Sequence, residues 1–375
     1  MIEIKDKSRC SGCHACVSTC PKGCIKMISD DNGFLYPVVD EIACVNCGAC
    51  NKSCYFEYAS VKKTVQEVFA VSNLNENIRL KSSSGGVFYS LAKEVIDNGG
   101  VVFGAAFDER FNVVHRYVEK IEDIYLLQGS KYVQSVIGDC FKRVKELLKL
   151  NRKVLFTGTP CQINGLLTYL KEDHPNLLTM DFICHGVPSP MVWRSYLDEM
   201  IEKYNSPIKD ISFRSKEYGW KKYSLKIKFD NGDEYFGKIG EDPYLRSFIM
   251  DVHLRESCYN CNSKGIDRPA DITVADFWGI GEVCKEMNDD KGVSVVILRG
   301  EKATHIFEKL KCAFLVETSD INTIVKLNPS IISSASKNQL RQKFLILVRK
   351  KGFRKAYKRY CDITLYSKIY RKLKL

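Results

Sequence analysis

The sequence lacks a long apolar run. None of its stretches reaches the roughly 18 to 20 consecutive apolar residues that a membrane-spanning helix needs. Its opening, MIEIKD, is charged and contains no apolar segment of the kind found in secretion signals. We therefore expect a cytoplasmic protein, either soluble or held peripherally at the inner face of the membrane.

Excess charge is absent from most of the chain. The formal net charge is +12, and residues 341–375 account for all of it, with 13 Lys and Arg against one acidic residue, Asp362. The remainder is neutral overall and lacks the basic excess that nucleic-acid binding needs. We expect no nucleic-acid partner.

Cysteine is too sparse for a disulfide scaffold, but it is grouped. The chain has 17 cysteines in 375 residues, and such grouping favours metal binding in a reducing compartment. Two groups, at 10–20 and 44–54, repeat the spacing C-x₂-C-x₂-C-x₃-C, and Pro21 follows the first. In this ferredoxin spacing three cysteines hold one [4Fe–4S] cluster and the fourth reaches the other cluster. Cross-ligation predicts two ligand sets: Cys10, Cys13, Cys16 and Cys54 for cluster one, and Cys20, Cys44, Cys47 and Cys50 for cluster two.

Zinc is the alternative for these residues, because C-x₂-C pairs also bind zinc. Zinc takes four thiolates from two such pairs, however, and does not need a doubled run of four. Two details depart from the ferredoxin pattern. Tyr55 stands where a second proline is usual, and Cys24 fits no ligand position, so we interpret Cys24 as a small buried hydrophobic residue.

The order of patterns predicts an α+β ferredoxin-like module at 1–58 and then an α/β body at 67–335. Apolar patterns indicate strands at 67–72, 101–107, 154–157, 177–183 and 293–298, and helices at 86–97, 138–149, 166–171, 191–204 and 302–310. Segments 224–229 and 234–238 flank the turn DNGD and predict a hairpin. Repeated alternation with one hairpin favours a mixed sheet.

Three segments of the body come at strand ends, where α/β sheets bind ligands. Ser83, Ser84, Gly85 and Gly86 precede a helix, and their hydroxyls and bare amides suit a phosphate, although the same residues also serve as a plain helix cap. The segment does not match G-x-G-x-x-G or the Walker pattern. Thr159 and Cys161 follow the strand at 154–157, and the segment 181–186 ends the next strand.

Four cysteines outside the module form a candidate thiolate quartet. Two follow successive strands and two form a C-x₂-C pair: Cys161, Cys184, Cys258 and Cys261. The alternative is that the first two are core residues and the pair is incidental, because spacing alone cannot group scattered cysteines.

Three polar residues are further candidates for the site. His185 suits a proton donor near a redox centre, Lys131 an anion-binding or catalytic group, and Asp276 a ligand-facing carboxylate. Their structural alternatives are a packed histidine, a solvated loop lysine and a turn cap.

The tail at 336–375 mixes aromatic and aliphatic side chains with Lys and Arg. A basic amphipathic helix of this kind docks to an anionic membrane surface or to an acidic protein. A solvated helix face is the alternative.

Together these motifs resemble the coenzyme F420 hydrogenase/dehydrogenase β-subunit family. The resemblance reaches to about residue 335 and rests on the doubled cysteine run and on SSGGV (83–87), GSKY (129–132), GTPCQ (158–162), CHG (184–186), C-x₂-C (258–261) and ADI-x₃-DFWG (270–279). It implies a flavoprotein body that binds FAD at the Ser-Gly-Gly loop, and a third [4Fe–4S] cluster on the cysteine quartet.

The resemblance also implies a function. Members pass electrons between reduced carriers, such as ferredoxin, and varied acceptors that include deazaflavin. The branch with a basic tail resembles members associated with cell-surface polysaccharide synthesis, which suggests a glycan or lipid-linked sugar as the substrate. We expect an iron–sulfur flavin-dependent oxidoreductase. The alternatives are an electron-transfer subunit that docks to a catalytic partner, and an assembly protein with structural clusters.

Overall fold

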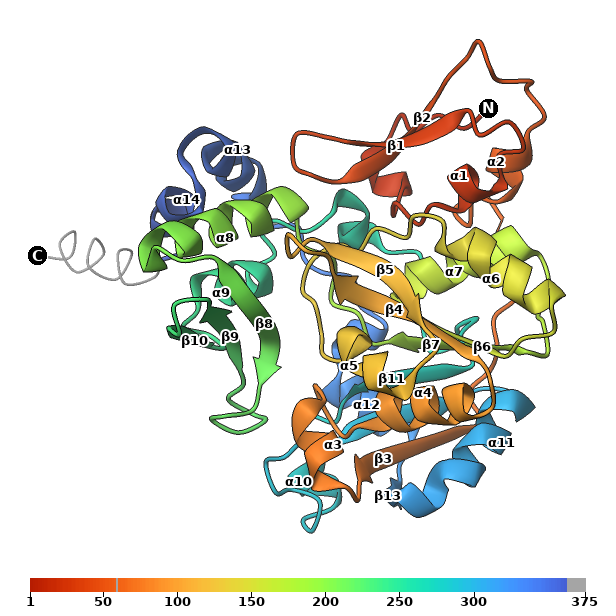
Figure 1. The fold of residues 1–375 in the computed structure, drawn as a ribbon, viewed down its shortest axis with the longest axis vertical. Coiled ribbons are helices and arrows are strands. Elements are labelled where there is room, and N and C mark those ends of the chain that lie inside the picture. Colours follow the sequence, from red (N-terminus) through yellow and green to blue (C-terminus); the bar gives the residue numbers. More distant parts are fainter. Residues whose placement is uncertain (59, 363–375) are drawn as a thin grey trace, which may run out of the picture.

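The computed structural model describes residues 1–58 and 60–362. Figure 1 shows an N-terminal cysteine-rich module above one end of a large sheet, with a small sheet beside it and two C-terminal helices packed over helix α8. The fold is mixed α/β, as the sequence predicts.

The N-terminal module is small and built around a hairpin. Its elements are α1 (Ala15–Thr19), β1 (Ile25–Ser29), β2 (Leu35–Val39) and α2 (Ala49–Lys52), and the two strands pair antiparallel. Asp30 closes the turn between them, since one carboxylate oxygen accepts the amides of Asn32 and Phe34, each at 3.0 Å. The hairpin of the module is therefore held by a fixed turn.

The large sheet has eight strands in the order β13-β3-β12-β11-β7-β6-β4-β5. The strands β4, β6, β7 and β11 run parallel, while the others pair antiparallel with their neighbours. Their bounds are β3 (Glu67–Asn73), β4 (Val101–Phe107), β5 (Val113–Val118), β6 (Val154–Thr157), β7 (Leu177–Phe182), β11 (Ile272–Asp276), β12 (Ser294–Leu298) and β13 (Phe314–Thr318). Because four neighbouring strands are parallel, their carboxyl ends meet at one edge of the sheet.

Alternating side chains divide the core between the two faces of this sheet. Val102 and Leu155 pack with helix α4 on one face, whereas Phe103 and Phe156 pack with helices α6 and α7 on the other. The helices of the body are α3 (Glu76–Lys81), α4 (Val87–Asp97), α5 (Ile124–Leu127), α6 (Cys140–Lys149), α7 (Pro160–Leu170), α8 (Pro190–Tyr204), α9 (Pro243–Ile249), α10 (Ile280–Val283), α11 (Glu301–Leu310) and α12 (Ile321–Leu327).

The small sheet consists of β8 (Ile208–Ser215), β9 (Ser224–Phe229) and β10 (Glu234–Lys238). The predicted hairpin is confirmed to the residue, because β9 and β10 pair antiparallel across the DNGD turn. Its third strand, β8, has no counterpart among the sequence predictions.

The tail begins with two helices that belong to the core. Helices α13 (Arg341–Lys351) and α14 (Phe353–Tyr360) bury Phe344, Leu345 and Phe353 against α8 and α9. The amphipathic pattern is therefore explained by packing within the protein, and the exposed side chains of the two helices are basic except for Gln342. The predicted tail beyond residue 362 lies outside the described residues. No helix in the described ranges combines the length and the apolar character that crossing a bilayer requires.

Candidate functional site

The structure gathers the cysteines of the module around two cavities. One cavity is lined by Cys10, Cys13, Cys16 and Cys54. The other is lined by Cys20, Cys44, Cys47 and Cys50. These are the two sets that cross-ligation predicts. Cys10 and Cys16 of the first set are buried, whereas Cys47 of the second set is exposed, so the second cavity lies nearer the solvent.

Cys24 also lines the second cavity. It is buried, as the sequence predicts, but its sulfur lies 3.3 Å from the sulfur of Cys20. The C-x₂-C rule gives Cys24 no ligand position, and only the fold places it against the cluster-two set.

A third cavity is lined by Cys161, Cys184, Cys258 and Cys261. Cys161 is in the first turn of α7, Cys184 comes two residues after β7, and Cys258 lies in a short 3₁₀ helix (Glu256–Asn260) just before Cys261. Because β6 and β7 are parallel neighbours, the segments that follow them are side by side. The predicted quartet is thus assembled by strand order, and its role as a ligand set stays a prediction.

A zinc ion and a polynuclear cluster need different spacings between their thiolates. A zinc ion holds thiolates at about 2.3 Å, so two of its sulfurs lie no more than about 4.6 Å apart. No group of three or more His, Cys, Asp or Glu within residues 1–58 and 60–362 is close enough to hold one metal ion. Four cysteines around a cavity instead fit a polynuclear cluster, which occupies space between its ligands.

Burial raises the pKa of several of these thiols. The pKa of Cys161 rises to about 11, and those of Cys13 and Cys258 rise to about 12. The desolvated thiolate is costly in each case, so these groups hold their protons until a cation replaces them. Iron binding would release protons from the first and third cavities.

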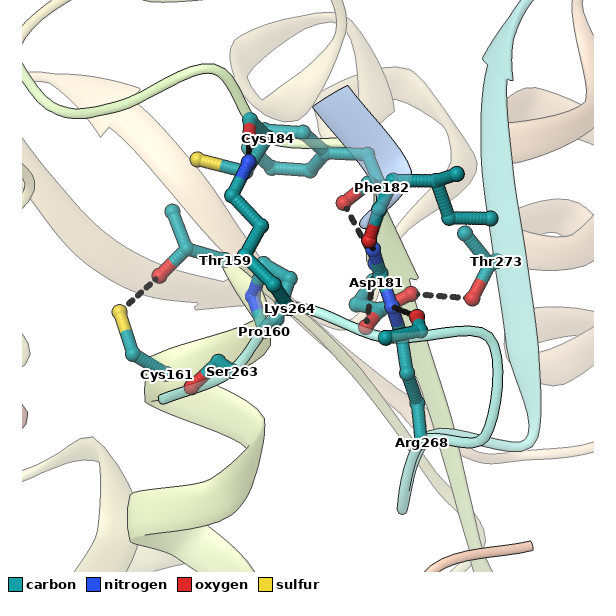
Figure 2. Close-up of polar contacts among 12 residues, drawn as sticks. Thr159, Pro160, Cys161, Asp181, Phe182, Cys184, Ser263, Lys264, Arg268 and Thr273 are labelled. Carbon is teal, nitrogen blue, oxygen red and sulfur yellow. Dashed lines mark hydrogen bonds and ion pairs between the residues drawn. The ribbon is translucent and has the colours of Figure 1, made fainter. Parts of the chain in front are cut away.

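A buried polar network holds the loop that carries the third cavity. Figure 2 shows Arg268 reaching Asp181 and the carbonyl of Phe182, at 3.4 and 3.2 Å, while Asp181 accepts the hydroxyl of Thr273 at 2.5 Å. The Lys264 ammonium donates to the Cys184 carbonyl at 2.5 Å. These contacts fix the Cys261 side of the cavity to the carboxyl end of β7 and to the first residues of β11.

The third cavity adjoins the cluster-one set. Its wall includes Ser11 and Tyr55, the residues that directly follow Cys10 and Cys54. Both are buried. The module therefore supplies part of the lining of a cavity whose four cysteines all come from the body.

His185 lines this third cavity, and Thr159 contacts one of its cysteines. The ring of His185 lies on its wall, with Nε2 at 2.6 Å from Asp251 Oδ1. The Thr159 hydroxyl lies 3.0 Å from the Cys161 sulfur, and Thr159 caps α7. The structure thus brings both predicted residues together with the quartet.

The Ser-Gly-Gly loop lies at the carboxyl edge of the sheet. The Ser83 hydroxyl accepts the Ser130 amide at 2.8 Å, the Ser84 hydroxyl donates to the Val293 carbonyl at 2.7 Å, and the Gly85 amide donates to Ser294 Oγ at 2.9 Å. Gly86 precedes the first turn of α4. The loop is held by β12 and by the segment that contains Lys131.

Lys131 and Asp276 make internal contacts at the same edge. The Lys131 ammonium donates to the carbonyls of Leu126 and Gln128, at 3.1 and 2.7 Å, and burial lowers its pKa to about 7. Asp276 accepts both terminal nitrogens of Arg214, at 2.8 and 2.9 Å. Asp276 therefore positions a buried arginine.

Sequence reasoning missed Arg214, because strand β8, which carries it, was not predicted. Arg214 also donates to the Ser83 carbonyl at 3.1 Å, which places it beside the candidate phosphate loop. Its Nε is buried and has no hydrogen-bond acceptor within the described ranges. An anionic group bound at this edge would supply an acceptor, so these residues fit the phosphate of a cofactor such as FAD.

Comparison with known proteins gives two matching families. Residues 151–324 match the C-terminal part of the beta subunit of coenzyme F420 hydrogenase/dehydrogenase, and residues 9–58 match the 4Fe-4S dicluster domain. An uncharacterized protein of Methanocaldococcus jannaschii is 24% identical over 344 residues, which cover 82% of this chain and 88% of that protein. The coenzyme F420-dependent sulfite reductase of the same organism is 29% identical over 169 residues, 44% of this chain and 26% of that enzyme.

One solved structure is also similar in part. The F420-reducing [NiFe] hydrogenase complex from Methanosarcina barkeri, studied as a xenon derivative, has a chain that aligns with a TM-score of 0.46 and 16% identity. The alignment covers 72% of this chain and 89% of that chain.

Proposed function

Because this chain carries the C-terminal domain of the coenzyme F420 hydrogenase/dehydrogenase beta-subunit family behind a 4Fe-4S dicluster domain, we propose that it is an iron–sulfur flavoprotein oxidoreductase. It takes electrons from ferredoxin or another reduced carrier and delivers them to an organic acceptor. The observation that carries the proposal is the third cavity, whose four cysteines adjoin the cluster-one set on one side and the carboxyl ends of β6 and β7 on the other.

The exposure of the cysteines supports an order in which electrons pass through the two clusters of the module. Cys47 is exposed and Cys16 is buried, so an external carrier reaches the cluster-two set first. The cluster-one set lies next, and its neighbours Ser11 and Tyr55 line the third cavity. This order suits delivery of single electrons from the surface into the body.

The residues at the carboxyl edge suit FAD. Arg214, Ser83 and Ser130 would hold its phosphates, together with the amides at the start of α4. FAD supplies exchange of one or two electrons. His185, oriented by Asp251, is placed to move a proton at its ring nitrogen, and Lys131 is a second proton-bearing group.

The acceptor we propose is a glycan or a lipid-linked sugar. The outer faces of α13 and α14 carry exposed basic side chains, which suit an anionic membrane surface or a phosphate-bearing lipid carrier.

An electron-transfer subunit is the second candidate function. It is favoured by the relationship to the F420-dependent sulfite reductase, because the chain spans about a quarter of that longer enzyme. In this case the organic chemistry belongs to a separate catalytic partner, which docks to this chain.

Cofactor analysis after anaerobic purification tests the proposal. We expect bound flavin and about 12 irons per chain with matching sulfide, because each cubane holds about four. About 8 irons would limit the protein to two clusters, and absence of flavin under gentle conditions would remove the proposed active site. Co-purification of a stoichiometric catalytic subunit, with no reduction of small acceptors by the chain alone, would favour the second candidate.

A further inference from the structure

Arg255 connects the module to the body through its side chain. It is fully buried, at 0% exposure, and lies three residues before Cys258. Its Nε donates to the Cys10 carbonyl at 2.7 Å, and one terminal nitrogen donates to the Leu35 carbonyl at 2.9 Å. The same nitrogen lies 3.6 Å from the Cys10 sulfur. A body residue thus contacts a predicted ligand of cluster one directly.

The remaining contacts of the guanidinium are neutral. Its other terminal nitrogen donates to Gln134 Oε1 at 2.9 Å, and its carbon lies 4.2 Å from the ring centroid of Tyr36. Gln134 in turn donates to the Ser11 carbonyl at 3.0 Å. These contacts orient the cation but do not neutralise it.

No carboxylate forms an ion pair with Arg255 within residues 1–58 and 60–362. The buried Arg214 and Arg268 differ, because each pairs with an aspartate. An unpaired buried charge is costly. A cluster held by four thiolates is negatively charged, and it lies where the missing counter-charge of Arg255 is needed.

The cysteine loop is shaped to admit this arginine. Gly12 has a φ of +70°, and a Cβ on Gly12 would stand 2.9 Å from a terminal nitrogen of Arg255 and 3.1 Å from the guanidinium carbon. A side chain at position 12 would therefore be strained and would also collide with the cation. Glycine lets the loop from Cys10 to Cys13 close around the guanidinium.

The backbone of Arg255 faces the third cavity. Its carbonyl accepts the Cys258 amide at 3.0 Å, and its amide donates to the Val187 carbonyl at 3.0 Å. Both Val187 and Cys258 line the third cavity. One residue thus fixes the cysteine loop of the body with its main chain and reaches the cluster-one set with its side chain.

From these contacts we infer that Arg255 is a positioning residue that raises the reduction potential of the cluster held by Cys10, Cys13, Cys16 and Cys54. One-electron reduction adds one negative charge to the cluster, and a desolvated cation with an N–H directed at a ligand sulfur stabilises that charge. The donor is the external carrier, and the electron remains on the cluster until the next centre accepts it. The inference rests on the proposed function, because it needs the clusters to be present.

Redox titration of the anaerobically purified holoprotein, followed by electron paramagnetic resonance, tests the inference. The test compares wild type with Arg255→Gln, which removes the charge, and with Arg255→Lys, which keeps it. We expect the cluster-one midpoint to become more negative in Arg255→Gln and to move less in Arg255→Lys. Cys13→Ser identifies the cluster-one signal by its loss.

The matched control is Arg9→Gln. Arg9 is also close to the cluster-one set, but it is half exposed and pairs with Glu57 at 2.8 Å, so solvent and the carboxylate already screen its charge. We expect a smaller shift than in Arg255→Gln. Equal midpoints in wild type and both Arg255 variants, with full iron, would overturn the inference and leave the proposed function intact. Wild-type protein without clusters would overturn the proposed function itself.

Discussion

Gly165 of α7 lies directly against Cys13 of the N-terminal module. A Cβ built on Gly165 would stand 2.7 Å from the Cys13 Cβ and 2.8 Å from its sulfur. Cys161, a predicted ligand of the third cavity, is one helical turn earlier on α7. A single turn of α7 therefore connects the cluster-one set to the quartet of the third cavity.

This contact predicts that Gly165→Ala destabilises the holoprotein and that Gly165→Val does so more. Helix propensity alone predicts the opposite, because alanine stabilises a helix by about 0.8–1 kcal/mol relative to glycine. Overpacking costs about 1–3 kcal/mol, and here it pushes on a cluster ligand. Thermal melting and iron analysis measure the two effects. A higher melting temperature in Gly165→Ala than in wild type, with full iron, would refute the contact.

Cys161→Ser should lower the iron content by about four atoms per chain, because one cubane loses a ligand. Cys312→Ser is the matched control, since Cys312 is exposed and lines none of the three cavities. Iron analysis decides the result. Equal iron in Cys161→Ser and wild type would remove the third cluster from the proposal.

Asp276→Asn should lower the stability by about 3–5 kcal/mol, because it leaves Arg214 buried without its carboxylate partner. The double variant Arg214→Met with Asp276→Asn should recover part of this loss, since no unpaired cation remains. Anaerobic thermal melting monitored by circular dichroism measures both variants. Additive losses in the double variant would contradict the pairing.

His115 should make the protein less stable as the pH falls. Its Nε2 lies 3.0 Å from the Thr157 carbonyl and its Nδ1 lies 2.6 Å from Ser135 Oγ. Burial lowers its pKa from 6.5 to about 4. Between pH 6.5 and pH 4 the histidine binds a proton in the unfolded chain but not in the folded protein. The contribution of His115 to the free energy of unfolding is therefore fully present above pH 6.5 and is lost as the pH falls toward 4.

The test compares melting temperatures at pH 7 and pH 5.5. We expect His115→Gln to show a smaller drop between the two pH values than wild type. His305→Gln, at an exposed position of α11, should keep the wild-type drop. An identical drop in His115→Gln would show that groups other than His115 cause the loss of stability at acid pH.

Charge reversal on the outer face of α13 and α14 tests the predicted membrane contact. Lys350, Lys351, Lys355 and Lys358 are exposed, and attraction to an anionic surface contributes about 1 kcal/mol per basic residue. Changing all four to Glu should abolish sedimentation with anionic vesicles and leave the fold intact. Reversal of exposed lysines on α6 is the control, and unchanged sedimentation in the tail variant would exclude the contact.

Elements with a local pattern are the ones that the sequence predicts well. The β9–β10 hairpin has alternating side chains around a DNGD turn, and α4 has apolar residues at helical spacing. Helix α7 begins well before its predicted start, because Thr-Gly-Thr-Pro has the composition of a loop. In the structure Thr159 is the N-cap and Pro160 the first helical residue. Edge strand β5 has no predicted counterpart, since the consecutive residues Arg116 and Tyr117 are both exposed and interrupt the alternation of buried side chains.

The candidate site is only partly predictable, for a similar reason. Repeated cysteine spacing identifies the two sets of the module, and the family resemblance groups the quartet. A single arginine has no spacing to detect, so Arg255 and Arg214 emerge only from the contacts. Lys131 and Asp276 stand out by motif, yet they contact backbone carbonyls and buried side chains.

The wall that Ser11 and Tyr55 give to the third cavity bears on how the protein matures. A body that folds before the module docks would leave the quartet open to water and to dioxygen, both of which attack reduced iron–sulfur centres. We therefore expect cluster insertion at the quartet to be completed only when the module closes over it. If the quartet holds the proposed cluster, exchange of the module for an unrelated ferredoxin domain should therefore lower the iron content of the body.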